Sequence, residues 1–304
     1  MTGAARGDRH GLGDPRIPWT ILLRVGERDA VPANRLRMLA RRLPDPVTLY
    51  RSGDALAIAA DHSRLDGLSL LAVLEEQLGV PVRSTAAGVG TDRPQDRLWT
   101  ALSRRAIEIS LHPPAVVAAS TSPAGSGDVF VEERVPGHVS TGRLVGAGAR
   151  AVARWNRAHH ARDQRVSVAI GVSTRPAGET QIGDHSAYLR LTDAETMRAD
   201  EVRAAIATAP LQPGGTPVGG GLLAAVTRLL APRLGSSLLV SHLGDVETTG
   251  CTDLAFYPVT GGASGVALGA VGIGGHTTIT LRARAAQHDE DGLRTLLATV
   301  LAEL

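Results

Sequence analysis

The order of strand-like and helix-like segments is the feature of this sequence that most restricts its fold. Short apolar runs are mixed with longer amphipathic segments, without the regular strand–helix–strand order of a doubly wound parallel sheet. The sequence therefore predicts an α+β (mixed α/β) fold, in which sheets with some antiparallel pairing are covered by helices. Strands are expected over residues 19–25, twice within 46–62 around a turn at 52–54, and over 129–136, 165–176, 188–192, 236–244, 265–275 and 276–285. Helices are expected over residues 33–43, 67–79, 92–111, 141–160, 193–209, 222–234 and 289–304.

The chain is long enough to form two lobes. It has 304 residues, of which 43% are hydrophobic, and this supports one large core or two smaller ones of roughly 150 residues each. Pro, Ser, Gly and other small residues over 113–128 can form a loop or the approach to a boundary. We expect a flexible arm over residues 1–16, an N-terminal lobe over 17–136 and a C-terminal lobe over 137–304.

Charge and cysteine content argue against several classes of protein. The formal net charge is +2 and the arginines are scattered, which gives little support to nucleic-acid binding. The single cysteine, Cys251, permits no intrachain disulfide and argues against a cysteine-based metal site. The first residues lack the apolar core of a signal peptide, and the most apolar later run, 265–281, is too rich in glycine to span a membrane. We expect a soluble, cytoplasmic protein.

One histidine stands where an apolar strand gives way to a helix. His62 follows the strand, and Asp66 and Gly67 come just before the leucine-rich helix. Loops at strand ends present reactive groups, and an imidazole can accept and return a proton near neutral pH. The spacing alone leaves two readings open, a catalytic base and a structural histidine that caps the strand, because His159 and Asp163 repeat it at the polar end of a helix.

The segment DHSRLDG, residues 61–67, resembles the HHxxxDG signature of the CoA-dependent acyltransferase superfamily, which includes condensation domains, polyketide-associated acyltransferases and wax ester synthases. Residues 166–191 resemble the strand, arginine and "GN" segment of that superfamily. Residues 238–246 resemble its "SNxG" segment, and 274–304 its closing strand and helix. The four segments occur in the expected order.

The sequence departs from the superfamily pattern at several positions. Asp61 replaces the first histidine of the signature, Asp184 follows Gly183 where the pattern has asparagine, and His242 follows Ser241 where it has asparagine. No DFGWG-like stretch is visible, and the segment before the signature is short. These departures leave open whether the acceptor side is trimmed or the original activity replaced.

The resemblance implies two lobes like chloramphenicol acetyltransferase subunits, arranged as a V around a central channel with the histidine midway. It implies that His62 takes a proton from a hydroxyl or amine acceptor that attacks an acyl thioester of CoA or of a carrier-protein phosphopantetheine. The thioester is then a co-substrate, and neither a permanently bound cofactor nor a metal is expected. A backbone N–H near Gly67 or the Ser241 hydroxyl would stabilise the oxyanion.

The other candidate residues have structural or channel-lining roles. Asp66 is expected to be structural, paired with Arg175 in preference to Arg282. His242 and His185 are candidates to face the channel together with Ser241. His276 is expected to be structural, and nothing near Cys251 marks it as an activated nucleophile.

Three functions fit these residues. The first is an acyltransferase of specialised metabolism, with a small-molecule acceptor and, where the donor is carrier-bound, an acyl or peptidyl carrier protein as partner. The second is a condensation-domain-like cyclase that acts on a biosynthetic intermediate without an acyl donor. The third is a non-catalytic module that docks a carrier. No partner among nucleic acids or membranes is expected.

Overall fold

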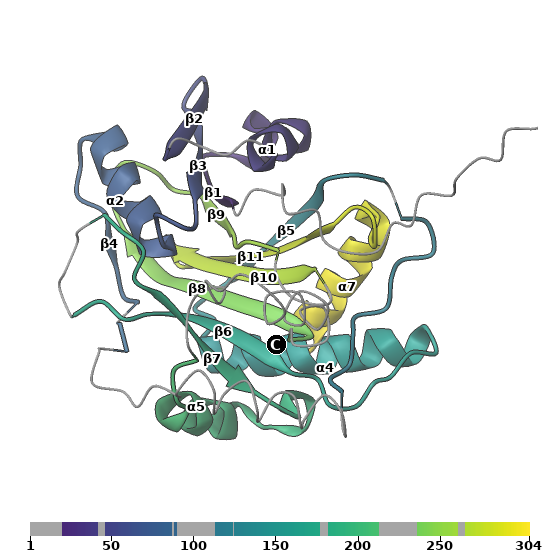
Figure 1. The fold of residues 1–304 in the computed structure, drawn as a ribbon. Helices are drawn as coiled ribbons and strands as arrows, with labels where there is room; N and C mark the ends of the chain where they lie inside the picture. The colour runs from purple at the N-terminus through teal and green to yellow at the C-terminus, as the bar shows by residue number, and fades with distance from the viewer. Residues whose placement is uncertain are drawn as a thin grey trace, which may run out of the picture.

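The computed structural model describes residues 20–41, 46–86, 88–89, 113–123, 125–176, 182–212, 236–260 and 265–304 (Figure 1). The arm expected over 1–16 and the helices expected over 92–111 and 222–234 lie outside the described residues. Within the described residues, no helix is both long and apolar enough to cross a membrane.

A small antiparallel sheet is built mainly from the N-terminal part of the chain. Its strand order is β2-β3-β1-β9. The strands are β1 (Thr20–Val25), β2 (Val47–Ser52), β3 (Ala55–Asp61) and β9 (Leu254–Tyr257). β2 and β3 form the expected hairpin, whose turn contains Gly53 at φ 57°. β9 was not expected from the sequence, and it pairs with β1 although more than 200 residues separate them.

A larger mixed sheet contains the strands of the C-terminal half. Its order is β5-β11-β10-β8-β6-β7, with the short strand β4 also paired to β8. β10 and β6 run parallel to β8, and the other pairs are antiparallel. The strands are β4 (Arg83–Ser84), β5 (Asp128–Pro136), β6 (Val168–Ser173), β7 (Ser186–Leu191), β8 (Leu238–Glu247), β10 (Val266–Ile273) and β11 (His276–Arg284).

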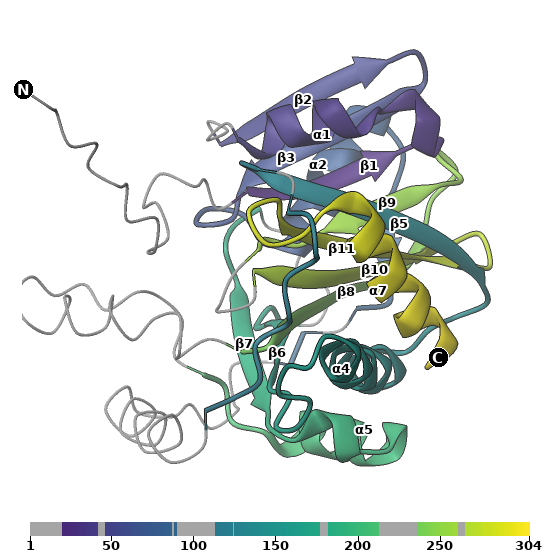
Figure 2. The same cartoon turned by 90° about the vertical axis from the view of Figure 1, so that its right-hand side faces the viewer.

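Five helices and two 3-10 turns cover the sheets in the described residues. In Figure 2, α4 and α7 lie side by side against the large sheet, and α5 packs beyond α4. α1 and α2 pack on the small sheet. The helices are α1 (Ala33–Ala40), α2 (Gly67–Leu78), α4 (Thr141–Ala158), α5 (Ala199–Thr208) and α7 (Glu290–Ala302), and the turns are η1 (Arg28–Ala30) and η2 (Ala194–Thr196).

The expected α+β architecture is confirmed, and one expected helix is wrong. The helix expected over 193–209 is broken, because Asp193 has φ 54° and Met197 is extended between η2 and α5. Ser140 caps α4 by accepting a hydrogen bond from the Arg143 N–H, and Gly79 ends α2 at φ 67°, as their residue types predict.

Buried arginines join the two sheets on the side of β5. Arg24 of β1 donates to Glu132 of β5 at 2.8 Å, and Tyr257 of β9 also donates to that carboxylate. Arg282 of β11, which pairs with Asp128 of β5 at 2.6 Å, also donates to the Thr20 carbonyl of β1. β5 thus belongs to the large sheet, and β9 belongs to the small one. The division into lobes at residue 136 stays a prediction.

One edge of β8 changes partner halfway along the strand. β10 pairs with β8 from Leu239 to Val246, so β6 and β4 must share the opposite edge. β6 occupies that edge as far as Ser241, and β4 occupies it from Val246. Between these pairings Gly244 has φ 74°, and the register against β10 shifts. This interruption opens the large sheet beside the small one, and the candidate site lies there.

Candidate functional site

The loop that carries His62 is organised by the residue before it. β3 is buried from Ala55 to Ala60 and ends at Asp61. The Asp61 carboxylate accepts from the Ser63 N–H at 3.0 Å, and its carbonyl accepts from the Arg64 and Leu65 N–H groups at 2.9 and 3.0 Å. An aspartate at the first position of the signature thus closes the turn that presents the histidine.

The His62 imidazole is half-buried and is held at both nitrogens. Its Nδ1 lies 3.0 Å from the Leu65 carbonyl. A carbonyl only accepts, so Nδ1 carries the hydrogen and Nε2 has the free lone pair. Nε2 lies 3.4 Å from the Tyr188 hydroxyl, and both side chains line a cavity. The nitrogen that can accept a proton therefore lies at the cavity, beside the Tyr188 hydroxyl.

The Asp66 carboxylate, at the start of α2, is surrounded by hydrogen-bond donors. Its carboxylate accepts from the Ser69 N–H and hydroxyl, each at 2.8 Å, and from Arg175 Nε and Nη2 at 3.0 and 2.9 Å. Asp66 and Arg175 are each only 3% exposed. The structure therefore places Asp66 in a structural ion pair with Arg175. Arg282, the less favoured candidate partner, is paired with Asp128 instead.

The space around Gly67 is too small for a side chain. It is the first residue of α2, and it is not among the residues with positive φ. A Cβ at this position would lie 2.6 Å from Leu243 Cδ2 and 3.4 Å from Phe256 Cζ. The close contact between α2, β8 and β9, and not a left-handed backbone conformation, therefore excludes a side chain here.

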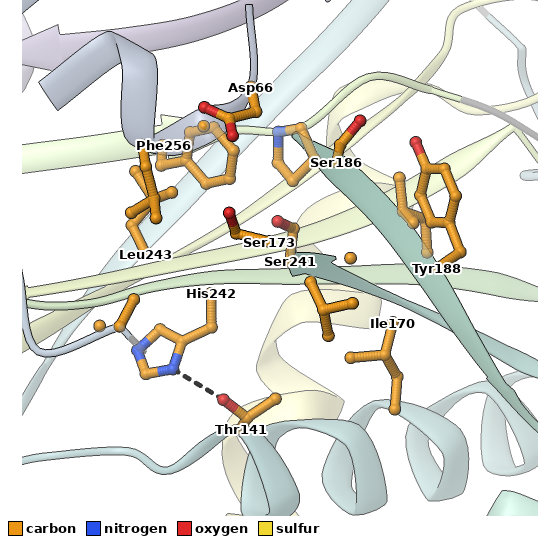
Figure 3. Close-up of a pocket in the computed structure, with 18 of the residues that line it drawn as sticks. Asp66, Thr141, Ile170, Ser173, Ser186, Tyr188, Ser241, His242, Leu243 and Phe256 are labelled. Atoms are coloured by element: carbon orange, nitrogen blue, oxygen red, sulfur yellow. Dashed lines mark hydrogen bonds between the residues drawn. The ribbon is translucent and has the colours of Figure 1, made fainter. Parts of the chain in front are cut away.

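The cavity has a volume of about 420 Å³ and reaches both faces of β8. Figure 3 shows Asp66, Ser241 and Tyr188 on one side of the strands and His242 with Thr141 on the other. Neighbouring residues of a strand point to opposite faces, so Ser241 and His242 must be divided in this way. The lining is mostly apolar with scattered hydroxyl groups, as is usual for a pocket that binds an organic molecule. Its apolar part includes Ile21, Leu68, Ile170, Leu239, Leu243 and Phe256.

His242 is a neutral imidazole at the α4 end of the cavity. Its Nδ1 lies 3.1 Å from the Thr141 hydroxyl at the start of α4. Burial, and secondarily the nearby His138, lowers its pKa from 6.5 to about 4, although Asp245 opposes this shift. His138 itself lies 2.7 Å from the Asp245 carboxylate. His242 is thus suited to hydrogen bonding and not to carrying charge near pH 7.

Three other histidines lie away from the cavity. His185 is not among its lining residues, because Ser186 and Tyr188 of β7 face it and odd-numbered neighbours point the other way. The interpretation that His185 faces the channel is therefore wrong. His276 is exposed at the β10–β11 turn, with Nδ1 3.1 Å from the Gly274 carbonyl. His159 bonds the Trp155 carbonyl at the end of α4.

The remaining candidates for reactive or metal-binding chemistry also lie elsewhere. Cys251 is half-buried outside the cavity, and burial followed by the nearby Asp253 raises the pKa of its thiol to about 11. Among the residues that the structure describes, no three His, Cys, Asp or Glu side chains gather as a metal site would require.

Sequence reasoning missed two residues that bear on the site. Tyr188 lies in a strand, where the sequence predicts that an aromatic side chain belongs to the core. Thr141 indicates only that a helix begins there. The alternation of Ser186, Tyr188 and Arg190 on one face of β7 was the available signal for the tyrosine.

Comparisons with known proteins bear on the fold. The sequence matches no protein-family model and no curated protein. Among solved structures, a condensation domain that mediates chain release from the enacyloxin polyketide synthase superposes with a TM-score of 0.51, at 14% identity over 82% of this chain and 57% of that one. The chain has a condensation-domain fold. The fold that the resemblance implied is therefore confirmed.

Other structures with this fold give lower scores. The cyclization-docking bidomain of EpoB from Sorangium cellulosum has a TM-score of 0.48 at 12% identity, over 82% of this chain and 59% of that chain. A starter condensation domain of rhizomide synthetase, in complex with C8-CoA and Leu-SNAC, has 0.48 at 13% identity, over 95% of this chain and 90% of that one. The chain thus spans less than two thirds of the first two structures.

Proposed function

We propose that this protein transfers an acyl group from a CoA or carrier-protein thioester to a hydroxyl or amine acceptor in specialised metabolism, with His62 as the general base. The observation that carries the proposal is the orientation of its ring. The bond from Nδ1 to the Leu65 carbonyl leaves the lone pair of Nε2 in the cavity. The condensation-domain fold supports this reaction class.

The reaction follows from this geometry. His62 Nε2 removes the proton from the acceptor while the acceptor atom forms a bond to the thioester carbon. The tetrahedral intermediate collapses, the carbon–sulfur bond breaks, and the imidazolium returns the proton to the leaving thiolate. No covalent acyl-enzyme is formed, and His62 ends in its starting state.

The oxyanion of the intermediate requires donors already in place. The Ser241 hydroxyl lines the cavity and is one candidate donor, and the backbone at Gly67, the first residue of α2, is the other. Asp66 does not take part in proton transfer in this proposal. Its bonds to Ser69 and Arg175 fix the end of the His62 loop.

The donor and the partner follow from the same reaction. The thioester is a co-substrate and not a bound cofactor, and the leaving thiol is either CoA or the phosphopantetheine of a carrier protein. The condensation domain of the enacyloxin synthase mediates chain release. We propose a comparable step here, in which a carrier-bound chain is passed to a small-molecule acceptor.

The test compares His62→Ala with His276→Ala, which removes an exposed imidazole far from the cavity. Acyl thioesters of N-acetylcysteamine and of a carrier protein are incubated with alcohol and amine acceptors, and product and free thiol are measured. We expect His62→Ala to reduce transfer by about 10²- to 10⁴-fold and His276→Ala to leave it unchanged. Equal activity in both variants would contradict the proposal.

The same assay separates the two alternative functions. A cyclase would convert one substrate with no second acceptor consumed and no acyl donor required. A docking module would bind the carrier protein and release no thiol, with or without His62.

A further inference from the structure

The position of the Tyr188 hydroxyl carries an inference about the acceptor. Tyr188 is in β7, and its hydroxyl lies 3.4 Å from His62 Nε2, the nitrogen that accepts the proton in the proposed reaction. In Figure 3 the hydroxyl points toward the side of the cavity on which Asp66 lies. An acceptor atom that forms a hydrogen bond to Nε2 must therefore also lie next to the Tyr188 oxygen.

The phenol remains a hydrogen-bond donor at all working pH values. Its side chain is largely buried, and burial, followed by the nearby Asp184 carboxylate, raises the pKa of Tyr188 to about 12. In the free protein its O–H donates to the lone pair of Nε2, since Nδ1 holds the imidazole hydrogen. When the acceptor forms a hydrogen bond to Nε2, the Tyr188 O–H needs a new hydrogen-bond partner, because a buried donor without one is costly.

The two classes of acceptor differ in what they offer this O–H. A hydroxyl oxygen has one hydrogen for Nε2 and two lone pairs, one to attack the thioester carbon and one to accept from Tyr188. A primary amine nitrogen has a single lone pair, which the attack uses. During attack an amine thus leaves the Tyr188 O–H unbonded, whereas an alcohol satisfies it.

We propose that Tyr188 makes this site select a hydroxyl acceptor over an amine, so that the protein forms esters. The inference rests on the proposed function and on His62 as its base. Bond formation is unchanged from that reaction: the acceptor oxygen bonds to the acyl carbon, its proton goes to Nε2, and the thiolate leaves and takes that proton.

The first experiment uses Tyr188→Phe, which removes only the hydroxyl. Tyr50→Phe, which changes a residue of β2 outside the cavity, is the matched control. Each variant is assayed with one thioester donor and with an alcohol and an amine of the same carbon skeleton. We expect Tyr188→Phe to lower the ratio of kcat/KM for the alcohol to kcat/KM for the amine about tenfold, because the variant has no O–H for the amine to leave unpaired, while Tyr50→Phe leaves this ratio unchanged.

Two outcomes of this assay would overturn the inference. One is an equal change in kcat/KM for both acceptors, and the other is no change for either. If transfer still depends on His62 in those cases, the proposed function stands and only the selection by Tyr188 fails.

A second experiment needs no turnover. Nitrogen NMR of the histidine side chains reports the hydrogen bonds at each ring nitrogen, and the His62 resonances are assigned with His62→Ala. In Tyr188→Phe the Nε2 resonance of His62 should move, and that of Nδ1, bonded to Leu65, should stay. An unmoved Nε2 resonance would overturn the inference whatever the kinetics show.

Discussion

The two ends of the cavity differ in how the buried polar groups are paired. At the α2 end the buried Asp66 carboxylate has four hydrogen-bond donors from Ser69 and Arg175. At the α4 end His242 is bonded at Nδ1 to Thr141, while its Nε2 has no hydrogen-bond partner among the described residues. A buried carboxylate requires donors and a cation, as Asp66 has here, whereas the buried His242 imidazole avoids that cost by remaining neutral.

The largest predicted effect comes from removing the pairing at the α2 end. Arg175→Met leaves the Asp66 carboxylate buried without its cation, and we expect a loss of about 3–5 kcal/mol in the free energy of unfolding. Urea denaturation followed by circular dichroism measures this loss.

Arg157→Met is the control for that variant. Arg157 pairs with Asp163 at 2.8 Å, but its side chain is 73% exposed, so its loss should cost less than about 1 kcal/mol. Equal losses in the two variants would show that burial does not determine how much the Asp66–Arg175 ion pair contributes to stability.

The second prediction concerns pH and the α4 end. The pKa of His242 is lowered from 6.5 to about 4 by burial. Between pH 6.5 and 4 the unfolded chain binds a proton that the folded protein does not. The free energy of unfolding is therefore largest above pH 6.5 and decreases as the pH falls toward 4. This shift corresponds to about 3 kcal/mol from one group.

His242→Asn isolates that contribution from other titrating groups, including His288, whose pKa burial also lowers to about 4. We expect the free energy of unfolding of the variant to fall less steeply between pH 6.5 and 4 than that of the natural sequence. Parallel curves for the two proteins would mean that His242 is protonated in the folded state, and the contrast between the ends of the cavity would not hold.

The smallest predicted effect tests the packing of α2. In Gly67→Ala the new methyl group would lie 2.6 Å from Leu243 Cδ2, which must move. We expect a loss of about 1–3 kcal/mol in the thermal or urea unfolding free energy. Gly171→Ala, whose methyl group would lie 3.1 Å from Ser241 Oγ, should lose less. The reverse order would place the tighter contact between β6 and β8 and not between α2 and β8.

Local patterns in the sequence predicted much of the fold. The β2–β3 turn and the adjacent strands β10 and β11 depend on residues close to one another in the chain, and the structure has each of them. β9 was missed because its strand character comes from pairing with β1, a partner that no local pattern reveals. Propensity over 193–209 favoured one helix, but the left-handed turn at Asp193 starts a separate 3-10 turn there.

The candidate site was predictable only in part for the same reason. The loop after β3 fixes His62, Asp66 and Gly67 within a few residues of each other, so spacing could identify them. Tyr188 reaches His62 across 126 positions of sequence. Only the pairing of β6 with β7 and β8 brings it there.

The placement of β9 has a consequence for how the molecule is made. β1 is paired with β3 on one edge and with Leu254–Tyr257 on the other. During synthesis the first sheet is therefore one strand short until residue 257 has left the ribosome. Until then the outer edge of β1 stays open to strands of other nascent chains. Shortening the interval between translation of β1 and of β9, by circular permutation, should raise the yield of folded protein.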